Sequence, residues 1–188
     1  MTAADANQPS DEELVESARR RESGGLTALY ERYYDRMFRF AYVRLGNRQD
    51  AEDVTQEVFL KMVDKIDSFK WQGVPFAAWL FKVGHNAVTD FQRKRSNRGV
   101  QTPLEDLPLI ASDNPEETVM NKLVLEAVTD NIQRLTPAQQ QVLALRFGAD
   151  LSVLDTAKIL NKAEGTVKAT QFQAFQTLRK LMASEGQR

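Results

Sequence analysis

The sequence predicts an all-α protein of two helical bundles joined by an acidic, proline-containing linker. Apolar residues recur at the three-to-four-residue spacing of amphipathic helices, and no stretch shows the apolar–polar alternation of a strand. Charge divides the chain in the same way: residues 25–96 hold twelve basic and nine acidic side chains, residues 119–188 hold nine and six, and residues 97–118 hold one and five. Three of the six prolines also fall within 97–118, so we expect this segment to be the linker.

Composition excludes several classes of protein. The chain has 188 residues, 42% of them hydrophobic and 27% charged, which is typical of globular proteins. It has no cysteine, so disulfides and thiolate metal sites are excluded. The longest apolar run, Phe76 to Phe81, is six residues, against the roughly 20 that span a bilayer. The first ten residues are polar and lack the core of a secretory signal. We therefore expect a soluble, cytoplasmic protein without membrane insertion.

The first bundle, residues 25–96, follows an acidic extension, residues 1–24. In the extension, Ser10 and Glu13 form a capping-box pattern that predicts a short helix to about residue 20. A long helix is expected to end at Gly46, and Asn47 suits the cap of the next one, which runs to about residue 66. After a loop at 67–74, Pro75 suits the first turn of a helix that runs to about residue 95.

The second bundle, residues 119–183, is followed by a short tail, residues 184–188. Its first helix is expected from the cap at 114 to about residue 132, and a second from Thr136 to Gly148. Residues 151–182 then read as a short helix, a three-residue turn and a longer helix, which is the spacing of a helix-turn-helix. We expect Ala157 and Gly165 to allow close helix approach, and Phe175 to pack inside the bundle.

In a helix-turn-helix, the start of the second helix enters the major groove of DNA. This geometry would turn the following side chains toward the duplex: Glu164, Thr166, Lys168, Ala169, Phe172 and Gln173. Any helical hairpin can share the pattern, so the motif alone does not decide the function.

Aromatic, amide and basic side chains are combined on the predicted helix at 75–95. They are Trp79, Phe81, His85, Asn86, Asp90, Arg93, Lys94 and Arg95. Aromatic rings stack on unpaired bases, amides bond base edges, and cations hold phosphates. We expect the preceding loop to expose Phe69, Lys70 and Trp71. The alternative is that the rings form core and the cations complement the helix dipole.

A third cluster is acidic and lies on the predicted helix that begins after Asn47. It consists of Asp50, Glu52, Asp53, Gln56 and Glu57, beside a Phe59 that we expect to be exposed. Such acids compensate the dipole of a helix N-terminus. A carboxylate face beside an exposed aromatic ring would also suit docking to a basic, partly apolar groove of another protein.

Two sets of motifs occur in a fixed order along the chain. The first consists of residues 29–34 (LYERYY), 50–60 (DAEDVTQEVFL) and 79–91 (WLFKVGHNAVTDF), and the second of residues 135–137 (LTP), 142–147 (VLALRF), 151–152 (LS) and 165–168 (GTVK). The first set resembles region two, and the second set region four, of the extracytoplasmic-function (ECF) sigma factors. The order and spacing of the motifs agree with the family across about residues 26–95 and 119–182.

The resemblance implies a dissociable subunit of bacterial RNA polymerase that recognises two promoter elements and opens the duplex. Its implied partners are the core polymerase, through the clamp helices of the largest subunit and the β flap, promoter DNA in duplex and single-stranded form, and an anti-sigma factor. No cofactor or metal is implied. The linker would run through the RNA-exit path toward the active-site cleft.

The resemblance also assigns roles by position. Implied polymerase contacts are Asp50, Asp53, Gln56, Glu57 and Phe59. Implied minus-ten contacts are Phe69, Lys70, Trp71, Trp79, Lys82, Asn86, Asp90, Arg93, Lys94 and Arg95. Implied minus-thirty-five contacts are Arg146, Glu164, Thr166, Lys168, Ala169, Phe172 and Gln173. The chain departs from the family at Thr170, Gln173 and Phe175, where Arg or His is common, so fewer phosphate contacts are expected.

Three alternatives remain open at this point. An enzyme is disfavoured because His85 is the only histidine and no phosphate loop or nucleophile motif is present. A helical adaptor that binds only proteins would suit the cation-poor last helix, but leaves the basic run at 93–95 unexplained. A helix-turn-helix repressor without initiation activity would leave the first bundle without a role.

Overall fold

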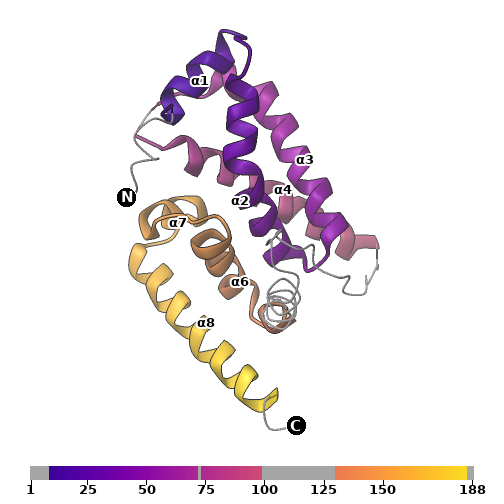
Figure 1. Cartoon of the computed structure of the whole chain (residues 1–188). Coiled ribbons are helices and arrows are strands. Elements are labelled where there is room, and N and C mark those ends of the chain that lie inside the picture. Colours follow the sequence, from indigo (N-terminus) through magenta and orange to yellow (C-terminus); the bar gives the residue numbers. More distant parts are fainter. Residues whose placement is uncertain (1–8, 72, 99–129, 186–188) are drawn as a thin grey trace, which may run out of the picture.

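The computed structural model describes residues 9–71, 73–98 and 130–185. Two groups of helices form the described part of the chain (Figure 1). The first group, which we call the front lobe, comprises α1 (Asp11–Arg19), α2 (Gly25–Leu45), α3 (Arg48–Lys65), the 3-10 turn η2 (Ile66–Ser68) and α4 (Phe76–Arg98). The second, the rear lobe, comprises α6 (Pro137–Leu143), the π-helical turn η3 (Ala144–Gly148), α7 (Val153–Leu160) and α8 (Glu164–Glu185). No strand occurs among the described residues, which confirms the all-α prediction.

Local signals set the helix ends as predicted. Ser10 and Glu13 make the reciprocal bonds of a capping box at α1, and Thr136 and Gln139 do the same at α6. Gly46 adopts a left-handed conformation, φ 67°, where α2 ends. The Asn47 side chain then accepts a hydrogen bond from the backbone N–H of Asp50 at the start of α3. The expected linker and the helix from 114 to 129 lie outside the described residues.

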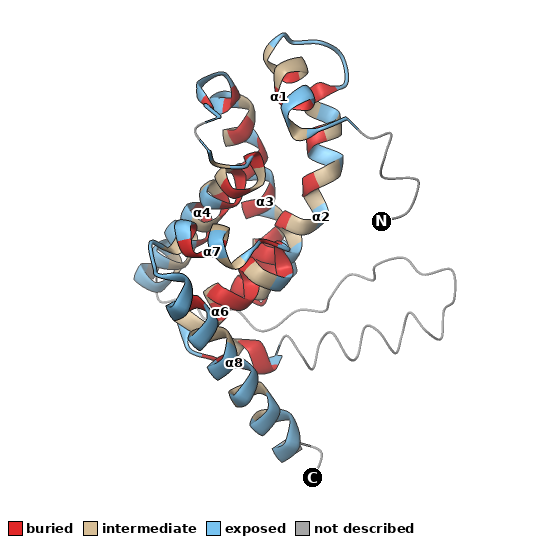
Figure 2. Ribbon diagram, turned by 90° about the vertical axis from the view of Figure 1, so that its left-hand side faces the viewer, coloured by how far each residue is buried: buried red, intermediate tan, exposed pale blue. Residues whose placement is uncertain are grey.

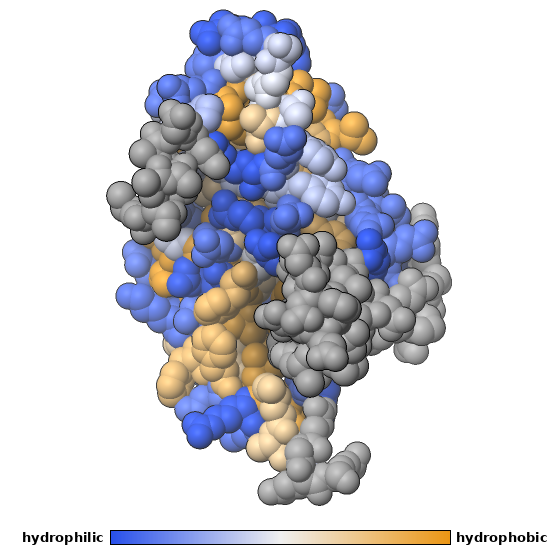
Figure 3. Space-filling model, in the orientation of Figure 1, coloured by the Kyte–Doolittle hydropathy of each residue, from blue (hydrophilic) through white to orange (hydrophobic). Residues whose placement is uncertain are grey.

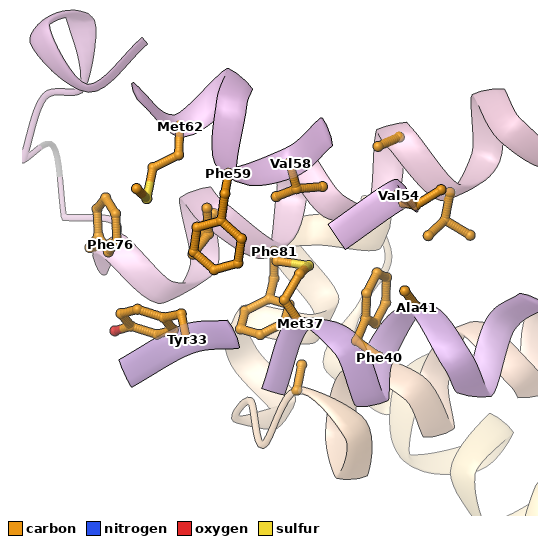
Figure 4. Packing of buried hydrophobic residues seen from close by; sticks show 14 of the residues in the cluster. Tyr33, Met37, Phe40, Ala41, Val54, Val58, Phe59, Met62, Phe76 and Phe81 are labelled. Atoms are coloured by element: carbon orange, nitrogen blue, oxygen red, sulfur yellow. The ribbon is translucent and has the colours of Figure 1, made fainter. Parts of the chain in front are cut away.

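The front lobe surrounds a core of aromatic and aliphatic side chains from α2, α3 and α4 (Figure 4). Tyr33, Phe40 and Phe81 are fully buried, and the Phe81 ring meets Phe40 edge-on with centroids 5.8 Å apart. Helix α1 closes one end, because its Asp11 accepts hydrogen bonds from Arg32 at 2.7 Å and from the Tyr33 hydroxyl. This core holds α4 against α2 and α3. Helix α4 carries most of the residues predicted to bind unpaired DNA.

The rear lobe contains the predicted helix-turn-helix. Asn161 adopts a left-handed conformation, φ 53°, directly after α7, and α8 starts at Glu164. Val142, Ala157 and Val167 form a small buried cluster between α6, α7 and α8. The remainder of α8 is mostly exposed (Figure 2).

Two expectations about this motif were wrong. A Cβ built on Gly165 meets no atom within 4 Å, so this glycine faces open space instead of easing helix contact. Phe175 is 44% exposed: its ring meets the ring of Phe147, which is also exposed, edge-on with centroids 5.3 Å apart, instead of packing inside the bundle.

The two lobes pack against each other. Ala144, Leu145 and Ala149 of the rear lobe belong to the same buried cluster as α2 and α4. The Arg36 guanidinium of α2 donates hydrogen bonds to the carbonyl oxygens of Ala149, at 2.5 and 3.0 Å, and Asp150, at 3.3 Å. A composition-based division into bundles does not predict this shared core. None of the helices in the described ranges has the length and apolarity needed to cross a membrane.

Candidate nucleic-acid interface

Helix α4 and the loop before it carry one candidate surface. Lys70, Lys82, Asn86 and Asp90 are exposed, Trp71 is 37% exposed and Trp79 is half-buried. The structure therefore brings aromatic faces, an amide and cations onto neighbouring parts of one lobe. This combination suits single-stranded nucleic acid, which offers flat bases and phosphates.

Phe69 does not belong to the exposed part of that surface. It is only 4% exposed, because its ring packs against Phe76 and Trp79 at centroid distances of 5.5 and 5.2 Å. Arg19 of α1 also donates to its carbonyl oxygen. The expected exposure of Phe69 was wrong: the ring fixes the loop and supports Trp71, 4.8 Å away, and Trp79.

Two of the three cations at the end of α4 have acidic partners. Arg95 forms an ion pair of 2.7 Å with Asp50 of α3, and both side chains are largely covered. Arg93 pairs with Asp90 of the same helix at 3.1 Å, in solvent. The resemblance implies that Asp50 contacts the polymerase and that Arg95 contacts DNA, whereas the structure pairs the two side chains across α3 and α4. Lys94 is exposed.

The outward face of α3 carries the acidic cluster. Asp53, Gln56 and Glu57 are exposed. Phe59 was wrongly expected to be exposed: it is 5% exposed and packs on Tyr30, with ring centroids 4.8 Å apart. Leu60 is 68% exposed on the acidic face, and none of the sequence motifs singles it out. Helical periodicity does predict the exposure of Leu60, because it lies opposite the buried stripe of Val54, Val58 and Met62.

The start of α8 presents the residues expected to face duplex DNA. Glu164, Thr166, Lys168, Ala169, Phe172 and Gln173 are all exposed. Arg146 is half-buried, and its guanidinium donates to Gln171 at 3.2 Å and to the carbonyl oxygen of Leu151. Phe172 is 65% exposed and Phe147 is 53% exposed. Apolar surface accordingly gathers over the rear lobe in Figure 3.

The imidazole of His85 on α4 and the guanidinium of Arg44 on α2 lie largely inside the front lobe. Burial, and then the positive charges of Arg44 and Lys82, lower the pKa of His85 to about 4. Burial alone lowers the pKa of Arg44 to about 10, and its guanidinium donates to the Gln92 side chain at 2.7 Å. His85 is therefore neutral near pH 7 and has the environment of a structural residue. Within the described residues, no group of three acidic or histidine side chains is arranged to hold a metal ion.

Known proteins match both lobes. Sigma-70 region 2 matches residues 29–98 and Sigma-70 region 4 matches residues 132–180. The ECF RNA polymerase sigma factor BldN of Streptomyces coelicolor is 36% identical over 184 residues, covering 97% of this chain and 70% of that protein. The chain belongs to the ECF RNA polymerase sigma factors. SigW of Bacillus subtilis, another ECF sigma factor, is 29% identical over 157 residues, or 79% of this sigma factor and 83% of SigW.

Solved structures agree with the fold of this sigma factor. CnrH, in complex with the cytosolic domain of CnrY, superimposes with a TM-score of 0.70 at 21% identity, covering 93% of this chain and 97% of that one. The sigma factor RpoE of Bartonella quintana, in complex with the anti-sigma factor NepR, gives 0.70 at 24% identity, covering 84% and 96%. The matched ranges place α2, α3 and α4 in region 2 and α6, α7 and α8 in region 4.

Proposed function

We propose that this sigma factor binds core RNA polymerase through the outward face of α3, captures the unpaired minus-ten strand on α4, and reads the duplex minus-thirty-five element with α8. The observation that carries the proposal is that each lobe exposes one helix suited to one form of DNA. In the front lobe, α4 exposes the Asn86 amide beside cations, and the half-buried Trp79 and the exposed Trp71 of the preceding loop add aromatic rings. In the rear lobe, α8 is the second helix of a helix-turn-helix.

The mechanism is binding without covalent chemistry, so we propose no enzymatic activity. Unstacking and extruding a base costs a few kcal/mol, which stacking and edge contacts on α4 would offset. Duplex binding by α8 would raise the effective concentration of the front lobe at the melting site. Asp53, Gln56 and Glu57, with Leu60 among them, form the face offered to the polymerase clamp helices, and the rear lobe would meet the β flap.

The packed lobes must separate before both promoter elements can be bound. Lys82 of the front lobe donates to the carbonyl oxygen of Ile159 in α7 at 2.7 Å, so the two lobes touch next to the minus-ten residues. The minus-ten and minus-thirty-five elements are about 25 base pairs apart, roughly 85 Å at 3.4 Å per pair. Binding to polymerase therefore has to replace the interface between the lobes. An anti-sigma factor would act in the opposite sense, and all of these partners would be met in the cytoplasm.

The direct test is run-off transcription with purified core polymerase on a pool of genomic fragments. Promoter-dependent start sites are expected with this chain and not with core polymerase alone. Duplex binding without initiation would contradict the proposal and support a repressor, and no DNA binding would support an adaptor.

The strand-capture step has its own test. Asn86→Ala should reduce permanganate reactivity of the opened minus-ten region several-fold while duplex binding persists. Asn97→Ala removes an exposed amide from the end of the same helix and serves as the matched control. Equal loss of reactivity in both variants would contradict base capture by Asn86.

The duplex-reading step depends on α8. Gln173 carries an amide that suits the N6 and N7 atoms of adenine, whereas Lys168 suits phosphate. Gln173→Ala should relax preference at one base position of a selected minus-thirty-five duplex, and Lys168→Ala should weaken all duplexes alike. If Gln173→Ala lowers the affinity for every base variant of the duplex equally, Gln173 does not read a base.

A further inference from the structure

A pocket of about 420 Å³ lies between the two lobes. Its apolar lining includes Phe69 and Trp79 of the front lobe and Ile159 of the rear lobe, and its cationic lining consists of Lys70, Lys82 and Lys158. The three lysines are exposed, while Trp79 is half-buried and held by its contacts with Phe69 and Phe76. No Asp or Glu is found among the described residues that line it.

We propose that this pocket binds a small nucleoside phosphate and that the bound nucleotide holds the two lobes together. The volume lies in the range of small-molecule sites, and an apolar lining with a few polar groups is their usual character. The Trp79 ring, held by its contacts with Phe69 and Phe76, offers a stacking face for a base. Three cations in a lining whose described residues include no carboxylate favour a ligand with several negative charges. A nucleoside di- or triphosphate combines both features.

The position of Lys158 connects binding to the arrangement of the lobes. Lys158 lies on α7, whereas Lys70 and Lys82 belong to the front lobe, so all three cations line one pocket only while the lobes are packed. Their mutual repulsion disfavours the packed state. An anion among them removes that repulsion, and a ligand that binds only the packed state shifts the population toward it. The effect on transcription rests on the proposed function, but the binding does not.

Isothermal titration calorimetry on the full chain tests the binding directly, with ATP, GTP, ADP and AMP as probes. Saturable binding is expected to be tightest for the triphosphates. Lys158→Ala should lower the affinity for ATP at least about fivefold, because removing one cation from a multi-cation site removes a charge-assisted contact. Lys162→Ala is the matched control, since Lys162 is an exposed lysine just beyond α7 that does not line this pocket. Failure of every nucleotide to bind at 1 mM (about the upper range of useful affinity), or equal weakening by both variants, would overturn the proposal.

A single-stranded oligonucleotide distinguishes the nucleotide site from the promoter site. We expect Lys158→Ala to leave the affinity for a 12-nucleotide single strand unchanged. Two outcomes would show that the pocket is part of the single-strand binding surface and that the proposal is wrong. One is that single strands bind while free nucleotides do not. The other is that Lys158→Ala lowers the affinity for single strands as much as the affinity for ATP.

Small-angle X-ray scattering tests whether a bound nucleotide holds the two lobes together. Saturating ATP should decrease the radius of gyration of the wild-type chain and leave that of Lys158→Ala unchanged. In run-off transcription, raising ATP above the concentration that elongation needs should inhibit initiation by the wild-type chain and leave initiation by Lys158→Ala unchanged. Loss of initiation by both chains at the lowest ATP concentration would instead contradict the proposed function, so the two failures are separable. Nucleotide binding without a change in the radius of gyration would overturn the proposal that the nucleotide holds the lobes together.

Discussion

The two lobes bury their apolar residues in different ways. Of the twelve largest fully buried side chains among the described residues, only Leu145 comes from the rear lobe, and it belongs to the cluster shared with α2 and α4. The rear lobe instead exposes Phe147, Leu154, Phe172, Phe175 and Met182. The front lobe therefore has a large core of its own. The rear lobe has only two small buried clusters, one around Leu143 and one around Val142, and it shares its largest fully buried side chain with the front lobe.

Removing a ring from the front-lobe core should have the largest effect. Phe81 is fully buried and makes edge contacts with Phe40 and Tyr33. Phe81→Ala should lower the free energy of unfolding by about 3–5 kcal/mol, measured by urea denaturation, because it leaves a cavity in a packed core. Both lobes should lose stability together, since Leu145 packs into the same cluster. If the rear lobe alone retained its stability, the shared core would be contradicted.

Separating the lobes should have an intermediate effect. A Cβ on Gly148 would lie 3.0 Å from the Cα and 3.1 Å from the N of Phe40, which are backbone atoms that cannot move aside cheaply. Gly148→Ala should cost about 1–3 kcal/mol of stability, as overpacking does, and should increase the radius of gyration.

Gly165→Ala is the matched control for this substitution, since its Cβ meets open space. It should raise stability by about 0.5–1 kcal/mol, because alanine is the better helix former. Equal destabilisation by the two glycine variants would show that the contact with Phe40 does not hold the lobes together.

Acid should weaken the front lobe through His85. Its pKa is about 4 in the folded chain, chiefly because of burial, and about 6.5 when unfolded. The unfolded chain therefore binds more protons between these values, and stability falls as the pH drops from 6.5 toward 4. We expect His85 to contribute about 1–2 kcal/mol of that loss, less than full linkage gives, because the ring is partly exposed. Urea denaturation of His85→Gln across this range should show a shallower decline, and an unchanged slope would contradict the assignment.

Substituting an exposed ring of the rear lobe should have the smallest effect on stability. Phe172→Ala should change the free energy of unfolding by less than about 0.5 kcal/mol, as surface substitutions do. It should nevertheless weaken duplex binding, measured by fluorescence anisotropy, if α8 faces the groove. Met182→Ala, near the far end of α8 and 50% exposed, should leave duplex binding unchanged. Destabilisation by Phe172→Ala comparable to that of Phe81→Ala would remove the contrast between the lobes.

Most of the described helices, and several of their ends, can be predicted from the sequence alone, although the helix expected to reach Gly148 ends at Leu143 and continues as a π-helical turn. Caps such as Ser10, Asn47 and Thr136 act within one turn of the chain, so their effect can be predicted from neighbours in the sequence. The exposed faces of α8 and most of α4 also follow from helical periodicity. The same periodicity predicts that Leu60 is exposed, once the buried stripe of α3 is recognised.

Which of the candidate side chains can reach a partner depends on contacts between segments that are far apart in the chain. Phe59 and Phe69 are buried by rings from other helices, Asp50 is paired with Arg95 across 45 residues, and Lys82 is bonded to the rear lobe. Burial and pairing depend on segments that are distant in the chain, so the periodicity of one helix does not predict them. The docking of the lobes likewise depends on surfaces whose complementarity exists only after each helix has folded.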